Sequence, residues 1–429
     1  MRLTILNQFF YPDHSATSQL MTELAQSLSE QGVEVTALAS RGRYNGGDTL
    51  PIREMYKGVR IERAWATGFG KSTLFGRLSD YLTFYLAAFW KLLTMRRQDV
   101  VMALTTPPLI GLIALIVGRL RGMRFVALME DLYPDVAIAL GALNQHSRLA
   151  RVLDWLTCQM LRRADRIIVL SDCMLERVIA KIGPEAASRI DVIHNWADGQ
   201  EIMPLTEGEE GFFNQNDWPE LNDKFVVLFS GNLGLVNEFT TVLEAAKSLR
   251  HQSGIAFVFI GAGARAGEIR NFALQHDLTN VRMLPYQPRE ALPRCLASGD
   301  ALLITLADGL AGLSVPSKTY SGLAAGRPLL FVGDQRSSVA SLIATHHCGA
   351  AIPSGDSHLL ADTLSRWAAN REALNQLGVT ARSLFEQRFD RHVAVQGYLR
   401  SLRNCFNGDS RRRKAKLEEG MAINEESVS

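Results

Sequence analysis

The sequence predicts an α/β protein made of two doubly wound, Rossmann-like domains that face an interdomain cleft. Short runs rich in Val, Ile and Leu alternate with segments of helical period, which is the pattern of parallel sheets covered by helices on both faces. The alternation occurs in two successive series separated by a polar stretch. The chain has 429 residues, of which 47% are hydrophobic, and this is enough for two cores. In such folds ligands bind between the units, beyond the carboxyl ends of the strands.

The first series occupies residues 1–195. Its clearest strands are predicted at residues 3–6, 33–39, 100–104, 124–129 and 166–170. Apolar residues recur at helical spacing between these runs, so helices are predicted at residues 16–31, 74–95, 109–121, 147–163 and 171–182.

A polar stretch at residues 196–223 is the predicted linker, and a second domain follows at residues 224–385. The strands of this second series are predicted at residues 225–230, 256–260, 281–284, 301–305 and 328–332. Amphipathic helices follow, and residues 386–405 form the last of them. Residues 406–429 contain Arg411-Arg412-Arg413-Lys414 and few apolar residues, so this tail is predicted to be disordered.

The composition argues against a nucleic-acid partner and for a cytoplasmic location. The formal net charge is only +2, and the five cysteines are scattered without a C-x-x-C pair, which fits a reducing compartment. The first residues look like a strand and not like a signal peptide. The longest apolar stretch, residues 100–117, is divided by Pro107-Pro108 into a strand and a helix, neither of which is long enough to span a bilayer.

The turn from Ser314 to Tyr320 is the most informative segment for function. It leads from a strand into a short helix, and it places free backbone N–H groups and the ammonium of Lys318 where a diphosphate fits. A nucleoside diphosphate is therefore the first ligand predicted.

Two glycine turns follow strands of the second series. The turn of Gly231, Asn232 and Gly234 is placed to face a phosphate or a sugar, although an ordinary strand-to-helix turn explains it equally well. Gly261 and Gly263 match the G-x-G-x-x-A dinucleotide fingerprint. The match follows the second strand of its unit and lacks the acidic residue expected after the next strand, so a dehydrogenase is not predicted.

Polar clusters also follow two strands of the first series. Asp13 and His14 precede a helix that Ser15 is predicted to cap, and they either touch a polar substrate or take part in capping. Asp131 ends a central strand, where sheets of this class place their chemistry, and this favours a functional role over a solvated acidic loop.

Several common reaction classes lack their motifs in this sequence. There is no D-x-D pair and no cluster of histidine and carboxylate at ligand spacing, so no metal cofactor is predicted. The P-loop, the G-x-S-x-G elbow and the C-x-x-C pair are also missing, which removes the usual routes to an NTPase, a hydrolase or a thiol enzyme.

The order and spacing of the motifs resemble a known family. Phe-Tyr-Pro-Asp, Glu-Asp-Leu-Tyr-Pro-Asp, Val-Ile-His-Asn-Trp-Ala-Asp, Ser-Gly-Asn-Leu-Gly, Gly-Ala-Gly and Val-Pro-Ser-Lys-Thr-Tyr occur in this order. Over nearly all of residues 1–405 the chain resembles bacterial exopolysaccharide glycosyltransferases of the retaining GT-B type (glycosyltransferase family 4). The likeness is greatest to those of colanic acid biosynthesis that are described as fucosyltransferases.

The resemblance implies an acceptor-binding first domain, a nucleotide-sugar-binding second domain and a last helix that crosses back to the first. The implied acceptor side comprises Asp13, His14, Ser15 and Asp131. The implied donor side comprises Gly231, Asn232, Gly234, Gly261, Gly263, Ser317, Lys318 and Ser321. Asp131 and Lys318 are the implied catalytic residues. For Lys318 the physical reason is that the leaving diphosphate gains negative charge, which an ammonium and backbone amides stabilise.

The chain departs from the family pattern at two places. Relatives carry a glutamate five residues before the glycine equivalent to Gly326, where this chain has Ser321. Relatives also carry a basic pair after the first glycine loop, where this chain has Leu235-Val236-Asn237-Glu238.

Retention of configuration is expected to occur by front-face attack of the acceptor hydroxyl, assisted by the departing diphosphate. No second carboxylate is evident that would support the double displacement used by glycosidases. The implied donor is a nucleotide sugar, with GDP-fucose inferred from likeness alone, and the implied acceptor is a sugar linked to polyprenyl diphosphate.

Residues 74–97 could bring the enzyme to such an acceptor. Their aromatic residues alternate with Arg77, Lys91, Arg96 and Arg97, which suits a helix lying in the inner membrane surface. A core helix whose aromatic face packs on the sheet explains the pattern equally well. The aromatic residues are Phe75, Tyr81, Phe84, Tyr85, Phe89 and Trp90.

Two further functions share this architecture. A non-hydrolysing nucleotide-sugar 2-epimerase would need acidic and histidine residues around the donor sugar, whereas the aromatic and basic first domain suits a large acceptor. An inactive nucleotide-sugar-binding partner is made conceivable by Ser321.

Overall fold

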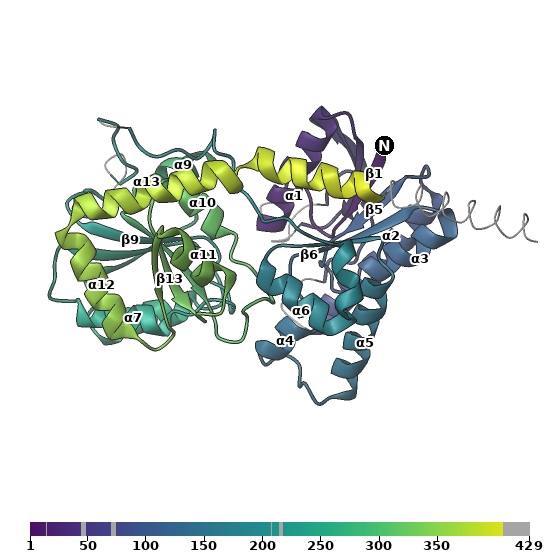
Figure 1. The fold of residues 1–429 in the computed structure, drawn as a ribbon. Helices are drawn as coiled ribbons and strands as arrows, with labels where there is room; N and C mark the ends of the chain where they lie inside the picture. Colours follow the sequence, from purple (N-terminus) through teal and green to yellow (C-terminus); the bar gives the residue numbers. More distant parts are fainter. Residues whose placement is uncertain (14, 44–48, 70–73, 207, 214–217, 406–429) are drawn as a thin grey trace, which may run out of the picture.

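The computed structural model describes residues 1–13, 15–43, 49–69, 74–206, 208–213 and 218–405. His14 and the tail of residues 406–429 lie outside the described residues. Two α/β domains lie side by side, and a long C-terminal helical segment runs along both of them (Figure 1).

The first domain is built on a sheet with the strand order β3-β4-β2-β1-β5-β6-β7-β8. Its strands pair in parallel, except that β3 is antiparallel to β4. The strands are β1 Arg2–Leu6, β2 Glu34–Ser40, β3 Arg53–Tyr56, β4 Val59–Ala64, β5 Val100–Ala103, β6 Arg124–Met129, β7 Arg166–Val169 and β8 Ile190–Val192. The helices are α1 Ala16–Glu30, α2 Leu74–Thr94, α3 Gly111–Arg121, α4 Asp135–Ala139, α5 Arg148–Arg162, α6 Asp172–Ile182 and the 3₁₀ helix η1 Pro184–Arg189.

The second domain is built on a parallel sheet with the order β11-β10-β9-β12-β13-β14. Its strands are β9 Phe225–Ser230, β10 Ile255–Ile260, β11 Val281–Leu284, β12 Ala301–Leu306, β13 Leu329–Gly333 and β14 Gly349–Ile352. Its helices are η2 Pro219–Leu221, α7 Thr240–Ser248, α8 Ala266–Gln275, η3 Arg289–Ala291, α9 Leu292–Ala297, α10 Lys318–Ala324, α11 Ser338–His346, α12 Ser357–Ala369 and α13 Arg371–Arg388.

Helices cover both faces of each sheet (Figure 1), which explains why the central strands are apolar throughout. All six residues of β10, Ile-Ala-Phe-Val-Phe-Ile, are buried. In the first domain β1 lies between β2 and β5, so that Leu3 is opposite Val35 on one side and Val100 on the other. The strand order reverses at β1/β5 and at β9/β12, and loops beyond such switch points are where these sheets bind ligands.

The chain returns to the first domain after α13. This helix ends at Arg388, and a further helix spans residues 391–405. Tyr398 and Leu402 of that helix are fully buried, and Ser401 Oγ donates a hydrogen bond of 2.6 Å to Asp191 Oδ2. The crossing segment is the yellow helix at the top of Figure 1.

The structure contains elements that the sequence patterns did not indicate. The β3–β4 hairpin extends one edge of the first sheet, and β8 and β14 each add a short strand at the other edges. Residues 53–56 are Arg-Glu-Met-Tyr, and such polar edge strands lack the apolar run by which buried strands are recognised. Within the described residues, no helix combines the length and apolarity needed to cross a membrane.

Candidate active site at the domain interface

The turn after β12 carries the lysine that the sequence singled out. Lys318 is the first residue of α10, and its Nζ lies 4.7 Å from the centre of the Phe229 ring. Within the described part of the chain no carboxylate pairs with this ammonium. Burial lowers the pKa of Lys318 to about 8, because desolvation disfavours the charged form. An anion placed beside it would therefore meet a poorly solvated, uncompensated cation.

The lysine stem lies across the first glycine turn. A Cβ on Gly231 would approach Lys318 Cε to 2.5 Å, and the φ of Gly231 is 132°. Only glycine combines this backbone conformation with so close a neighbour. The turn after β9 and the start of α10 therefore form one surface.

The second glycine turn packs directly on the first. A Cβ on Gly261 would lie 2.0 Å from Gly231 O, and one on Gly263 would lie 2.4 Å from Leu233 O. Leu233 N also donates to Ala262 O at 2.9 Å. The two loops are held backbone against backbone, and Asn232 and Gly234 lie on the first of them.

Two side chains that sequence reasoning missed support these turns. Asn237 is buried and donates from Nδ2 to Asn232 O at 3.2 Å and to Gly234 O at 3.0 Å. Its Oδ1 accepts a hydrogen bond of 3.1 Å from Thr305 on β12. Arg265 donates from Nη1 to Asn237 O and pairs with Glu268 at 2.6 Å. A guanidinium thus lies against the first glycine loop, although it comes from the second.

The two serines of the Ser-Lys turn have different surroundings. Ser317 is the N-cap residue of α10 without a capping hydrogen bond from its side chain. Ser321 donates from Oγ to Lys318 O at 3.1 Å. Both are half-buried and lie within one turn of Lys318.

Asp131 meets the same turn from the other domain. Its backbone forms an antiparallel bridge with Ser314, and Leu132 N donates to Leu313 O at 2.9 Å. Burial raises the pKa of the Asp131 carboxyl, and a hydrogen bond with the Ser314 side chain partly offsets this effect. The structure thus brings Asp131 to the start of the loop that ends at Lys318.

The neighbouring Glu130 is a third residue that the sequence analysis did not select as a site residue. Burial and the adjacent Asp131 raise the pKa of this carboxyl to about 7. Its Oε2 accepts a long hydrogen bond of 3.5 Å from Asn195, while Oε1 is buried without a partner among the described residues. Its charge also raises the pKa of Tyr320 and Tyr398, beyond the larger effect of their own burial. A strand-end Glu-Asp pair was the available sequence signal.

The predicted acceptor loop after β1 is described in part. Ser15 caps α1 by accepting a hydrogen bond from Ser18 N at 3.3 Å, which confirms the predicted cap. Asp13 N donates to Phe10 O at 3.1 Å in the preceding turn. His14 lies outside the described residues.

A second polar contact joins the domains near α1. Arg289 of η3 pairs with Glu23 of α1 at 2.8 Å and with Glu201 at 3.5 Å. Trp196 Nε1 donates to the other oxygen of Glu23 at 3.2 Å. Burial raises the pKa of Glu23, and Arg289 only partly opposes this rise. The Asp131–Ser314 bridge and the Arg289–Glu23 pair are therefore two separate places where polar groups of the domains meet.

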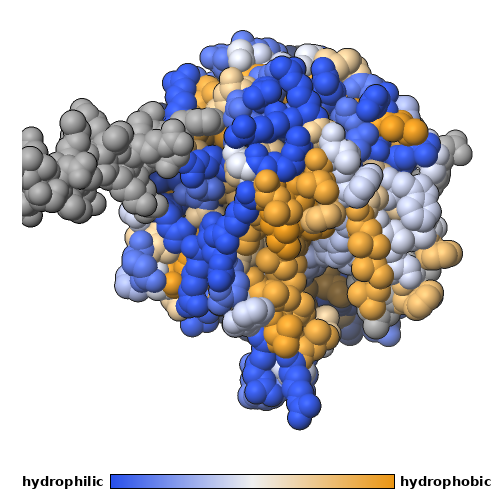
Figure 2. Space-filling view, turned by 90° about the vertical axis from the view of Figure 1, so that its right-hand side faces the viewer, coloured by the Kyte–Doolittle hydropathy of each residue, from blue (hydrophilic) through white to orange (hydrophobic). Residues whose placement is uncertain are grey.

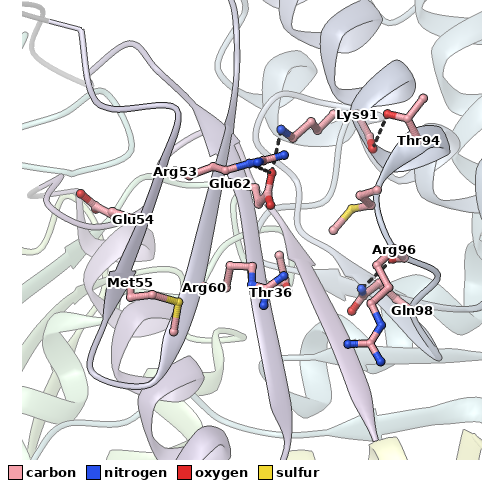
Figure 3. A pocket seen from close by; sticks show the side chains of 11 residues that line it. Thr36, Arg53, Glu54, Met55, Arg60, Glu62, Lys91, Thr94, Arg96 and Gln98 are labelled. Atoms are coloured by element: carbon pink, nitrogen blue, oxygen red, sulfur yellow. Dashed lines mark hydrogen bonds and ion pairs between the residues drawn. The ribbon is translucent and has the colours of Figure 1, made fainter.

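Two cavities are lined neither by Lys318 nor by the glycine turns. One of about 610 Å³ lies in the first domain, among β2, β3, β4 and the end of α2 (Figure 3). The other, of about 360 Å³, lies beside Asp308 and Asp334 in the second domain. The described residues contain no group of three or more His, Cys, Asp or Glu side chains that could hold a metal ion.

Comparison with known families matches each half of the chain to a glycosyltransferase domain. Residues 16–196 match the glycosyl transferase 4-like domain, and residues 212–384 match the glycosyl transferases group 1 domain. The first match contains every strand of the first sheet except β1, and the second contains the whole second sheet; together they include Asp131, the glycine turns and Lys318.

Individual relatives and solved structures agree with this assignment. The probable glycosyltransferase WbjE of Pseudomonas aeruginosa is 28% identical over 72% of this chain and 75% of its own length. The putative colanic acid biosynthesis glycosyl transferase WcaI of Escherichia coli K12 is 25% identical over 80% of this chain and 86% of its own. Sucrose-phosphate synthase from Thermosynechococcus elongatus superposes with a TM-score of 0.75 at 15% identity, covering 95% of this chain and 100% of its own. HepE of Anabaena, solved with UDP and glucose, superposes with a TM-score of 0.70 at 15% identity, covering 94% and 99%.

The parallel sheets, their strand orders and these structural neighbours establish the predicted GT-B architecture. With one glycosyltransferase domain in each half, the chain is an enzyme of the transferase class. This protein is therefore a two-domain GT-B glycosyltransferase, built from a glycosyl transferase 4-like domain followed by a group 1 domain.

Proposed function

We propose that this enzyme is a retaining glycosyltransferase that moves a sugar from a nucleoside-diphosphate sugar to a lipid-linked oligosaccharide during exopolysaccharide biosynthesis. The observation that carries the proposal is the Lys318 ammonium, which is desolvated, lacks a described carboxylate partner and lies across the Gly231 turn. A diphosphate is the anion that such a lysine and the surrounding backbone N–H groups suit best.

On the donor side, the glycine turns bring backbone close to the nucleotide, while Ser317 and Lys318 take the diphosphate. Charge builds up on the diphosphate oxygens as the bond to the sugar breaks, and Lys318 stabilises that charge most strongly in the transition state. The proposal needs no resident metal for this step. Ser321 takes the place of the glutamate of relatives, so its hydroxyl is the group offered to the nucleotide ribose.

On the acceptor side, the proposal places the sugar hydroxyl between Asp131 and the donor, with the loop of residues 13–15 nearby. The hydroxyl attacks the front face of the donor sugar and gives its proton to the departing diphosphate. Because Asp131 is bridged to Ser314, the acceptor loop and the lysine loop come together when the domains meet.

The relatives support the substrate classes. The name of the Escherichia coli relative refers to colanic acid, and the Anabaena structure contains UDP and glucose. A polysaccharide pathway and a nucleotide-sugar donor are therefore the substrate context proposed here. GDP-fucose, a polyprenyl-diphosphate acceptor and work at the cytoplasmic face of the membrane belong to the same proposal.

The exposed face of α2 supports contact with a membrane, although of the aromatic residues named from the sequence only Phe75 and Trp90 are exposed. Phe84 is fully buried and packs in the core, while Leu78, Leu82, Leu86 and Trp90 are between 56% and 66% exposed. These four residues are spaced by four and share one helical face. We call them the α2 stripe.

A thermal-shift series with UDP, GDP and dTDP tests the donor class. The nucleotide that binds raises the unfolding temperature in proportion to the logarithm of its concentration over its dissociation constant.

Lys318→Ala should abolish most of this shift and lower turnover by roughly 100-fold, because the charge on the leaving group loses its main partner. Excess EDTA should leave turnover unchanged.

The matched control is Lys247→Ala, on the exposed side of α7 in the same domain. It should leave both the shift and the turnover as in the native enzyme. If Lys318→Ala retains the native nucleotide affinity and rate, the proposed diphosphate site is wrong.

A further inference from the structure

The larger cavity lies outside the active site, at the edge of the first sheet. It is bounded by β3 and β4, by Thr36 on β2 and by the last turn of α2 (Figure 3). Neither the glycine turns nor Lys318 contributes to it. Its volume of about 610 Å³ is sufficient for a small polar headgroup.

This cavity is predominantly cationic. Its cationic lining residues are Arg53, Arg60, Lys91 and Arg96. Lys91 and Arg53 converge on Glu62 from opposite sides, at 2.7 Å and 3.3 Å (Figure 3).

The remaining charges leave a positive excess. Glu54, the other acidic residue of the lining, pairs at 2.7 Å with Arg63, whose side chain is fully buried. Arg96 reaches only the exposed Glu34, at 3.5 Å, and Arg60 is exposed without an acidic partner among the described residues. Arg60 and Arg96 are therefore the two cations available to an anion in this pocket.

The α2 stripe leads directly to this pocket. Adding four residues to Trp90 gives Thr94, which lies on the same helical face and lines the cavity. The neighbouring helices α3 and α5 add exposed Ile116, Leu120 and Trp155 to the apolar surface. Figure 2 shows an apolar strip flanked by hydrophilic residues on the side of the molecule that carries these helices.

We propose that the pocket formed by Arg53, Arg60, Lys91 and Arg96 binds the phosphate headgroup of an anionic phospholipid while the α2 stripe enters the adjacent acyl region. The inference rests on the proposed function, because a lipid-linked acceptor requires the enzyme to work at a membrane. An apolar surface alone attracts lipids of any charge, and a cationic pocket alone attracts any phosphate. Their alignment on one helix face fits a phospholipid, which presents a phosphate directly above apolar chains.

Co-sedimentation with vesicles tests the pocket. The full chain should bind vesicles of phosphatidylglycerol and phosphatidylcholine more tightly than vesicles of phosphatidylcholine alone. Arg60→Ala/Arg96→Ala should weaken binding to the anionic vesicles by roughly 10- to 30-fold, since each cation near an anionic surface contributes about fivefold. Leu82→Ser/Trp90→Ser should weaken binding to both kinds of vesicle.

The matched control removes two cations from the same side of the domain but outside the pocket. Arg119→Ala/Arg151→Ala changes exposed residues of α3 and α5 and should cost clearly less binding than the pocket variant. Equal losses for the two variants would mean diffuse charge attraction and would overturn the pocket. Equal binding of the native chain to both kinds of vesicle would also overturn the pocket. So would release of the chain from vesicles by millimolar inorganic phosphate, if the chain shows no preference for anionic vesicles.

The nucleotide thermal shift distinguishes this inference from the proposed function. Arg60→Ala/Arg96→Ala should keep the native shift with nucleoside diphosphate, because both residues lie outside the donor site. Suppose that the native chain shows no thermal shift with nucleoside diphosphate, but that Arg60→Ala/Arg96→Ala still loses more binding to anionic vesicles than Arg119→Ala/Arg151→Ala. The donor proposal then fails and the lipid pocket stands.

Discussion

At the residue scale, Lys318 links the electrostatics of the site to pH. Its pKa is lowered to about 8 by burial, so the ammonium loses its proton in a range where most lysines stay charged. A diphosphate favours the charged form and must therefore bind less well as the pH rises through this value.

The affinity for nucleoside diphosphate should fall about fivefold between pH 8 and pH 9 in the native enzyme. Lys318→Arg keeps its charge throughout, so its affinity should be flat over this range even if it is weaker overall. Isothermal titration at several pH values measures both. A native affinity that does not change with pH would show that the lysine is not the titrating group at the donor site.

The pKa of Glu130 is shifted upwards, in contrast to that of Lys318, and its protonation is coupled to the stability of the fold. Its pKa is raised from 4.5 to about 7, so the folded protein holds a proton that the unfolded chain releases in this interval. The stabilising contribution is complete below about pH 4.5 and is lost as the pH rises through about 7. Above that value a buried, incompletely paired carboxylate destabilises the fold, as is common where a residue serves function.

Glu130→Gln should therefore stabilise the protein at pH 8 relative to pH 5. The difference in unfolding free energy between variant and native protein should shift by about 1–3 kcal/mol in favour of the variant across that interval. Thermal unfolding at both pH values measures it, with Glu176→Gln on the surface of α6 as the control for losing an exposed carboxylate. A difference that is the same at both pH values contradicts the raised pKa.

At the element scale, the two glycine turns depend on close contact of backbone with backbone. Gly261 has a φ of 139°, and a Cβ there would lie 2.0 Å from Gly231 O. The contact leaves no flexible side chain that could move aside. The turns must separate if either glycine is replaced.

Gly261→Ala should lower the free energy of unfolding by about 2–4 kcal/mol and abolish the nucleotide thermal shift. Gly267→Ala, six residues later in α8, has nothing within 4 Å of the new Cβ and should be neutral or stabilising by up to about 1 kcal/mol. Native-like nucleotide binding by Gly261→Ala would show that the contact between the turns is not needed for the donor site.

The α2 helix shows where sequence patterns stop being sufficient. Aromatic and aliphatic residues occur all around it, so periodicity alone could not assign its inner face. The inner face of α2 is set by packing against α3, β2 and β4, which buries Phe84, Ala88 and Leu92. The opposite face is then left with leucines and Trp90, which composition alone does not distinguish from core residues.

At the scale of the whole molecule, the two-domain fold was predictable because buried parallel strands leave uninterrupted apolar runs. The positions of Lys318 and the glycine turns were predictable because each follows such a run. The roles of Asn237, Arg265 and Glu130 were not, since each depends on a neighbour distant in sequence: Thr305, the first glycine loop and Tyr398. The basic pocket was missed for the same reason, as its cations come from separate strands and a helix end.

The chain passes between the domains twice, and the two passages touch. Ala197 N donates to Phe389 O at 3.3 Å, Arg391 N donates to Ala197 O at 3.0 Å, and Arg391 pairs with Asp198 at 3.0 Å. Any swing of one lobe relative to the other must bend both passages at this place, so they act as a single pivot. Asp131 and Ser314 lie on opposite domains, so any swing that separates the domains at this place also breaks their backbone bridge.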